Sequence, residues 1–130
     1  MAYVATGLIG LNALIHLYIL WMEMFAWEAR GPVVFDGLFP DGAPDMFAAT
    51  ASMAANQGLY NGFLAAGLIW ALTIRDGLWR RNVATCFLCF VAVAGLYGAV
   101  TVAPTTLIVQ TLPAALALGA LWVNRRSAAT

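Results

Sequence analysis

Four long apolar segments leave this 130-residue chain few ways to fold. They cover about residues 2–27, 56–74, 82–103 and 105–123. Each is close to the roughly 20 helical residues that cross the hydrocarbon core of a membrane. Strands would leave unpaired backbone groups in hydrocarbon, so we expect helices. The pattern predicts an all-α fold with one domain over residues 1–130: an integral membrane four-helix up-and-down bundle.

The composition indicates lipid as the main partner of this chain. Hydrophobic residues make up 63% of it and charged residues only 9%, too few to cover an apolar core with a wetted surface. The formal net charge is zero, so the chain offers no basic face to nucleic acid, and we expect no nucleic-acid binding.

The orientation follows from the arginines, since the chain contains no lysine. Basic residues follow the second and fourth segments: Arg75, Arg80, Arg81, Arg125 and Arg126. The long first connection, residues 28–55, carries Arg30 against four acidic residues: Glu28, Asp36, Asp41 and Asp45. Cationic connections stay in the cytoplasm, which predicts an N-in/C-in, multi-pass protein of the inner (cytoplasmic) membrane with one long extracytoplasmic loop. Four aromatic residues lie at segment ends, as interfacial residues do: Tyr3, Trp27, Trp79 and Trp122.

The long loop contains glycines and prolines that break any long helix. Asp45, directly after Pro44, is placed to cap a helical extension that runs into the second segment.

Polar residues inside the apolar segments are the most informative feature. Asn12, His16 and Glu23 of the first segment fall within a stripe of about 40° on a helix. The second segment begins with a broad polar face of four residues: Asn56, Gln57, Tyr60 and Asn61. Beside it Gly58 and Gly62 form a GxxxG pattern, which is typical of close helix packing.

Counting residues from the cytoplasmic end of each helix places several of these polar groups at similar depths. His16, Asn61 and Gln110 each lie about 20 Å from the cytoplasmic end of their segment, at about 1.5 Å per residue. Glu23, Asn56, Gln57 and Tyr97 fall in the outer half. Because a polar group facing lipid costs several kcal/mol, we expect these groups to turn inwards as a funnel that opens outwards.

Two interpretations of this polar set are open. Its members can act only as helix-to-helix contacts, each hydrogen bond contributing roughly 0.6 to 2 kcal/mol. The set also contains the only histidine of the chain, His16, and the only acid of the four segments, Glu23. Ionisable residues inside a membrane usually mark a functional site, so we favour a functional pocket.

The cysteine pair Cys86 and Cys89 carries less information. A zinc site needs further thiol or imidazole ligands, and a redox pair needs an exposed, electropositive setting. Neither is evident in the sequence, so we interpret the pair as two small apolar residues one turn apart. No motif predicts a metal or another cofactor.

Several segments resemble one family. They are HLYILWMEMFAW (16–27), NQGLYNGFLAAGL (56–68), GLYGAVT (95–101) and QTLPA (110–114). They closely resemble an uncharacterised family of small membrane proteins of bacteria and fungi, a domain of unknown function. The resemblance spans nearly the whole chain and implies a four-helix fold without an established activity. Family members often carry a glutamate directly before the histidine, where this chain has Ile15.

The leading hypothesis is a membrane enzyme that moves protons to or from a lipophilic small molecule, such as an isoprenoid or polyketide lipid. Glu23 is the candidate acid or base, and His16 its partner or a second proton carrier. The remaining polar residues are the candidates for substrate binding: Asn12, Asn56, Gln57, Tyr60, Asn61, Tyr97 and Gln110. Isomerisation, epoxide opening and cyclisation all suit such a site, which makes the candidate enzyme an isomerase or cyclase.

Two other function classes remain open. One is a small proton-coupled exporter, since one membrane glutamate in the first of four helices is similar to the small multidrug exporters. The other is a non-catalytic assembly subunit that docks a partner through its GxxxG face. A monomer and a homodimer are both compatible with the pattern.

Overall fold

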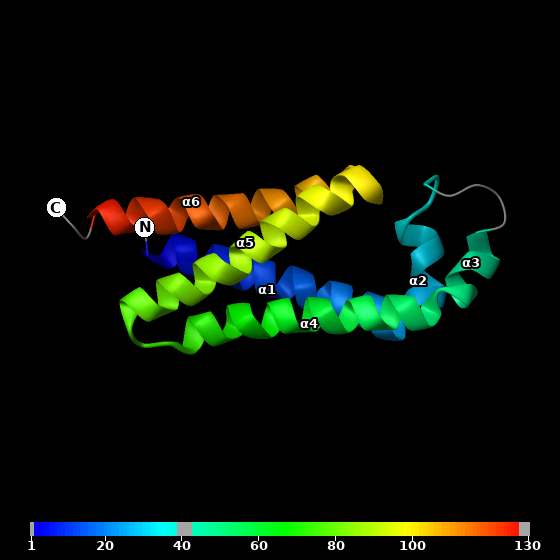
Figure 1. Ribbon diagram of the computed structural model, residues 1–130, viewed down its shortest axis with the longest axis horizontal. Coiled ribbons are helices and arrows are strands. Elements are labelled where there is room, and N and C mark those ends of the chain that lie inside the picture. The colour runs from blue at the N-terminus through cyan, green and yellow to red at the C-terminus, as the bar shows by residue number, and fades with distance from the viewer. Residues whose placement is uncertain (1, 39–42, 128–130) are drawn as a thin grey trace. The chain divides into compact units, whose positions relative to one another are not determined.

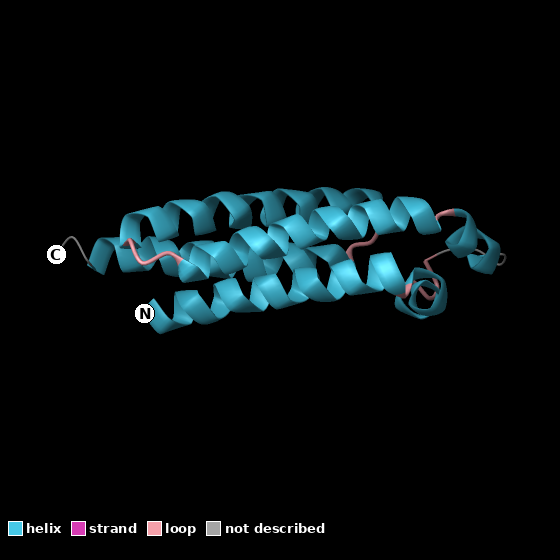
Figure 2. Cartoon of the chain, turned by 90° about the horizontal axis from the view of Figure 1, so that it is seen from below, coloured by secondary structure: helices cyan, strands magenta, loops and turns pink. Residues whose placement is uncertain are grey.

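The computed structural model describes residues 2–38 and 43–127 as helices joined by short connections (Figures 1 and 2). The helices are α1 (Ala2–Phe25), α2 (Trp27–Val34), α3 (Ala43–Ala49), α4 (Ala51–Thr73), α5 (Gly77–Thr101), the π-helical η1 (Leu107–Thr111) and α6 (Leu112–Ser127). The all-α fold class is thereby confirmed. Asp41 of the predicted loop lies outside the described residues.

Three helical stretches in the described part of the chain are long and apolar enough to cross a membrane: Tyr3–Phe25, Gly77–Thr101 and Leu107–Asn124. They correspond to the predicted first, third and fourth segments. The fourth helix of the expected bundle, α4, has 23 residues and is also long enough. It is not among the three, because its first half carries Asn56, Gln57 and Asn61.

Two of the long helices, α4 and α5, begin earlier than the sequence predicted. The third predicted segment starts at residue 82, whereas α5 starts at Gly77. Asp76 explains the difference, since its carboxylate accepts a hydrogen bond of 2.7 Å from the backbone N–H of Trp79 and caps the first turn. The polar residues between 76 and 82 therefore belong to the helix and not to a loop.

The chain divides into two compact units, and the boundary between them falls within α1 and α4. The first unit contains residues 1–15 and 64–130. Its core joins Ile9 of α1, Leu68 of α4, Leu88 of α5 and Ala114 of α6. Within this unit α5 lies along η1 and α6 (Figure 1).

A π turn opens the last long helix of this unit. Pro113 has no N–H to donate and would crowd the carbonyl of residue 109 in a regular α-helix. The chain instead widens over η1, and the N–H of Leu112 bonds to the carbonyl of Leu107, five residues back. Gly95 of α5 faces this turn, where a side chain would meet the backbone nitrogen of Thr111 at 2.8 Å.

The second unit contains residues 16–63 and includes the predicted loop. That segment holds two short helices, α2 and α3, which pack on each other. Phe47 is fully buried, and its ring lies 5.2 Å from that of Trp27. The indole N–H of Trp27 donates a hydrogen bond of 3.0 Å to the Thr50 hydroxyl. Trp27 is therefore half-buried in the core of this segment, unlike an interfacial anchor.

The predicted helical extension before the second segment is present. Only Thr50 separates α3 from α4, and its N–H donates to the carbonyl of Met46 at 2.9 Å. Asp45 lies inside the first turn of α3 and not at its cap.

Candidate functional site

The polar stripe of α1 is buried along most of its length. Because α1 is continuous from Ala2 to Phe25, the predicted spacing places Asn12, His16 and Glu23 on one face. Asn12 and His16 are fully buried, and Glu23 is half-buried. The Asn12 amide donates a hydrogen bond of 2.8 Å to the carbonyl of Leu8 on its own helix. Its amide nitrogen therefore has a partner within α1.

The centre of the candidate site is a pair formed by Glu23 and Asn61 in the second unit. The Nδ2 of Asn61 donates a hydrogen bond of 2.9 Å to Oε2 of Glu23. The same nitrogen donates to the carbonyl of Gln57, one turn earlier on α4, at 3.1 Å. The second bond fixes the amide to its helix, so that it presents a defined donor to the carboxyl group.

Two glycines bring the helices close enough for this pair to form. A Cβ at Gly58 would lie 2.7 Å from Cγ of Met24, 3.0 Å from Cβ of Glu23 and 3.1 Å from the carbonyl oxygen of Leu20. One turn further on α4, a Cβ at Gly62 would collide with the Leu20 side chain. The GxxxG face of α4 is therefore packed against α1 within the chain, as close helix packing requires.

A cavity of about 200 Å³ is lined in part by Glu23. It lies at a bend in the chain, where Ala26 leaves helical geometry with φ −132° and ψ 13°, and α2 begins. Phe25, Trp27 and Glu28 form part of its wall. No residue type predicts this bend, because neither proline nor glycine stands at residue 26.

His16 lies about two turns from Glu23 on the same helix, roughly 10 Å away by the helical rise. The side chain is fully buried. Neither Nδ1 nor Nε2 has a hydrogen-bond partner among the described residues. A buried donor without a partner costs about 1 to 3 kcal/mol, and this histidine makes no helix-to-helix hydrogen bond within the described residues.

The other predicted site residues are dispersed. Asn56, Gln57 and Tyr60 are exposed on α4, and Tyr97 is 71% exposed on α5. Gln110 is half-buried in the π turn of the first unit. Of the predicted site residues, the structure therefore brings Glu23 and Asn61 into contact, whereas the side chains of Tyr60 and Tyr97 are exposed.

No cluster of metal-binding side chains occurs in the described residues, where no group of three or more His, Cys, Asp or Glu side chains comes together. Cys86 and Cys89 are both free and exposed.

The fold and the site define a small all-helical protein with helices suited to a membrane and with one carboxyl–amide pair that joins two of them. Residues 10–122 match the model of the family described as "Protein of unknown function (DUF1304)", and the chain belongs to this family. No curated protein and no solved structure matches the chain.

Proposed function

We propose that α1, α4, α5 and η1–α6 cross the cytoplasmic membrane as a four-helix up-and-down bundle, with both ends in the cytoplasm. Three of these helices have the length and composition of membrane spans. The 23 residues of α4 have sufficient length, and Asn61 in its first half is half-buried and bonded to Glu23 of α1. An even number of crossings puts the arginines after α4 and α6 on the same side, as the positive-inside rule requires. Residues 28–55 would then lie outside.

We further propose that the protein is an enzyme that transfers protons to or from a lipophilic substrate. The observation that carries this proposal is Glu23, which lines a cavity and whose carboxyl group accepts a hydrogen bond from Asn61. An oriented carboxyl group at a cavity can donate or accept a proton in place, which is the requirement for general acid–base catalysis. Glu23 is the proposed acid or base.

His16 is the proposed second proton carrier. Its distance of roughly 10 Å from Glu23 along α1 is too long for direct transfer between the two side chains. A proton that Glu23 delivers to an alkene carbon would be balanced by one that His16 removes from another carbon of the same molecule, and proton exchange with water would then return both side chains to their starting states. The substrate neither gains nor loses atoms in this sequence, which makes the reaction an isomerisation or a cyclisation. An extended isoprenoid or polyketide lipid has the length to reach both groups.

The assembly-subunit alternative receives less support from this geometry, because α1 of the same chain occupies the GxxxG face. An exporter and an enzyme would both use the membrane glutamate, but they would differ in what happens to the substrate. An exporter moves its substrate across sealed vesicles unchanged, whereas the proposed enzyme returns a rearranged molecule.

Solvent deuterium separates these possibilities without knowledge of the substrate. The protein, in vesicles made from a cellular lipid extract, is incubated in D₂O, and the lipids are analysed by mass spectrometry. We expect one lipid species to gain deuterium at carbon with the natural chain and none to do so with Glu23→Gln. Asp45→Asn, which alters an exposed acid on α3, is the matched control and should keep the incorporation. Unchanged incorporation with Glu23→Gln would remove Glu23 from the reaction.

A further inference from the structure

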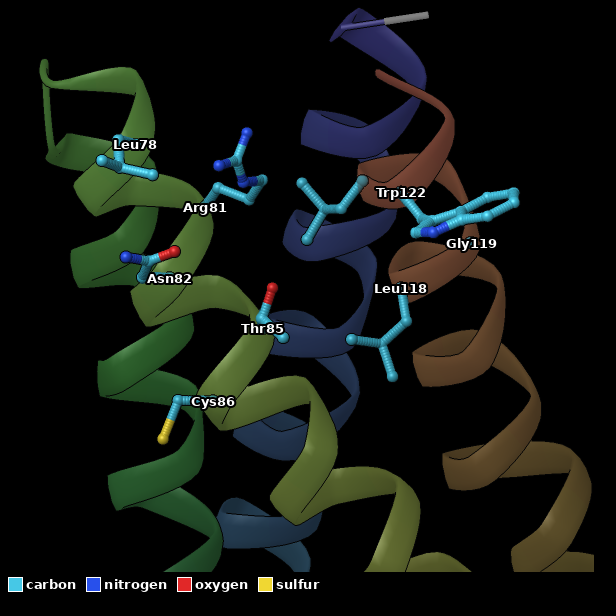
Figure 3. Close-up of a pocket in the computed structure, with 9 residues that line it drawn as sticks. Leu78, Arg81, Asn82, Thr85, Cys86, Leu118, Gly119 and Trp122 are labelled. Carbon is cyan, nitrogen blue, oxygen red and sulfur yellow. The ribbon is translucent and has the colours of Figure 1, made fainter. Parts of the chain in front are cut away.

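A groove of about 900 Å³ lies between the beginning of α5 and the end of α6, both in the first unit (Figure 3). Its wall on α5 is a stripe within residues 78–86, and its wall on α6 lies within residues 118–122. In Figure 3 Arg81 and Thr85 extend from α5 towards α6, and Leu118 extends in the opposite direction. The stripe on α5 covers about 12 Å along the helix axis.

The groove is cationic at one end and less polar at the other. Arg81 is half-buried at the cationic end, and its guanidinium group has no hydrogen bond or ion pair with any described residue. The neighbouring Arg80 differs, since it donates a hydrogen bond of 2.6 Å to the Thr6 hydroxyl. Cys86 and Leu118 line the opposite end of the groove. A guanidinium group without a counter-charge can pair with a phosphate group through its planar set of donors.

No acidic side chain among the described residues pairs with Arg81. Asp76 is the acid nearest in sequence, and its carboxylate caps α5 by accepting from the N–H of Trp79. Arg75, Arg80 and Arg81 outnumber it within six residues. Trp79 also packs edge-on against Trp70, with ring centroids 6.4 Å apart. Arginine and tryptophan together are typical of helix ends at the level of lipid headgroups.

We propose that this groove binds one anionic glycerophospholipid, whose phosphate pairs with Arg81 and whose acyl chain runs along Cys86 and Leu118. Charge complementarity selects the headgroup, because basic pockets between helices on the cytoplasmic side favour anionic lipids. The volume of the groove falls in the usual range for small-molecule sites, roughly 300 to 1,000 Å³. The proposal rests on the membrane placement above but not on the catalytic role of Glu23.

The two cysteines provide a matched test in the full-length chain. Cys86 lines the groove and Cys89 does not, and both thiols are exposed. The variants Cys89→Ser and Cys86→Ser each leave one thiol. Their rates of alkylation by N-ethylmaleimide are measured in detergent micelles that contain phosphatidylglycerol, phosphatidylcholine or inorganic phosphate without lipid.

Phosphatidylglycerol is expected to slow alkylation of Cys86 at least about fivefold relative to phosphatidylcholine, given the usual attraction of anionic lipid for one arginine. It should leave Cys89 unaffected. Arg81→Gln should remove the protection of Cys86, whereas Arg75→Gln, at an exposed arginine outside the groove, should keep it. Inorganic phosphate should give no protection.

Equal protection of Cys86 by both lipids, or protection that survives Arg81→Gln, would overturn the proposal. Protection by inorganic phosphate alone would assign the groove to a free anion and would overturn it too. If Arg81→Gln changes the alkylation of Cys89, Gly119→Leu replaces it, because Gly119 lines the groove and has open space around it. This variant should abolish the difference between the two lipids, and a persisting difference would refute the assignment. None of these outcomes bears on deuterium transfer at Glu23.

Discussion

The amide of Asn61 donates a hydrogen bond to the carboxyl group of Glu23 at 2.9 Å and so joins two helices across 38 positions of the sequence. Gly58 lies one turn before Asn61, at the point where a side chain would strike Cβ of Glu23. The close approach and the hydrogen bond therefore depend on each other. The glycine lets the two backbones come together, and the hydrogen bond fixes the orientation of the Glu23 carboxyl group.

The hydrogen bond between Asn61 and Glu23 should contribute measurably to the free energy of unfolding. Asn61→Leu removes the donor and leaves the carboxyl group of Glu23 unpaired, so we expect the free energy of unfolding to fall by about 1 to 2 kcal/mol. Thermal unfolding in detergent, followed by circular dichroism, measures the change. Gln57→Leu is the control: its side chain is exposed, and only its backbone carbonyl takes part in the Asn61 bonds.

A double-mutant cycle with Glu23→Gln tests whether the two residues act on each other. The coupling energy should be about 0.6 kcal/mol or more, the usual size for such pairs between membrane helices. Additive effects of the two substitutions would contradict the observed pairing.

Gly58→Ala should destabilise the pair of helices sterically. The added methyl group would lie 3.1 Å from the carbonyl oxygen of Leu20 and closer still to Met24 and Glu23, so the helices must separate. We expect a loss of about 1 to 3 kcal/mol. Gly7→Ala is the matched control on α1, because nothing lies within 4 Å of its added methyl group. That change should be neutral or stabilising by up to about 1 kcal/mol. Equal effects of the two substitutions would show that helix propensity, and not contact, controls the stability.

These residues also show which parts of the structure could be predicted from the sequence. Glu23, His16 and Asn12 share a face because their spacing matches the helical period, and this holds for any continuous helix. Depth counting placed Asn61 at the level of His16 and Gln110, whereas its amide donates to Glu23. The shared face of α1 follows from local periodicity, but the choice of partner on α4 does not.

The rest depended on contacts between distant residues. The long loop contains no long helix among its described residues, but α2 runs for eight residues through Gly31 and Pro32, and the ring of Phe47 takes the place of a side chain at Gly31. The bend at Ala26 and the cavity beside Glu23 have no local signal in the sequence. Exposure of Tyr60 and Tyr97 likewise depends on helix rotation, which periodicity alone does not determine.

Gly95 should be the least tolerant glycine of α5. Its added methyl group would lie 2.8 Å from the backbone nitrogen of Thr111, and the π turn at this point leaves the backbone no regular helix to relax into. Gly98→Ala, one turn further on, would meet only the Thr106 side chain, at 3.1 Å. We expect Gly95→Ala to lower the free energy of unfolding by about 1 to 3 kcal/mol and Gly98→Ala by less. A larger loss for Gly98→Ala, measured by the same thermal unfolding, would contradict the observed register of α5 and η1.

The four-span topology predicts a specific labelling pattern. In a chain with Cys86→Ala and Cys89→Ala, Leu38→Cys should react with a membrane-impermeant maleimide in intact cells. Gly77→Cys, at the first residue of α5, should react only after the membrane is permeabilised. Both positions are exposed, so accessibility within the protein does not limit labelling. If α4 does not cross, residues 38 and 77 lie on the same side, and both cysteines would react under the same conditions.

His16→Leu should stabilise the protein and abolish its proposed reaction. The buried ring has two nitrogens without partners among the described residues, and each unsatisfied group costs about 1 to 3 kcal/mol. A leucine of similar volume removes this cost, so the free energy of unfolding should rise by about 1 kcal/mol or more. Asn12→Leu, one turn earlier on the same buried face, should not stabilise the protein, because Asn12 already bonds to the carbonyl of Leu8. A gain in stability together with the loss of deuterium transfer would show that His16 is retained for function at the expense of the fold, as functional residues often are. A loss of stability with His16→Leu would instead assign the ring a structural role.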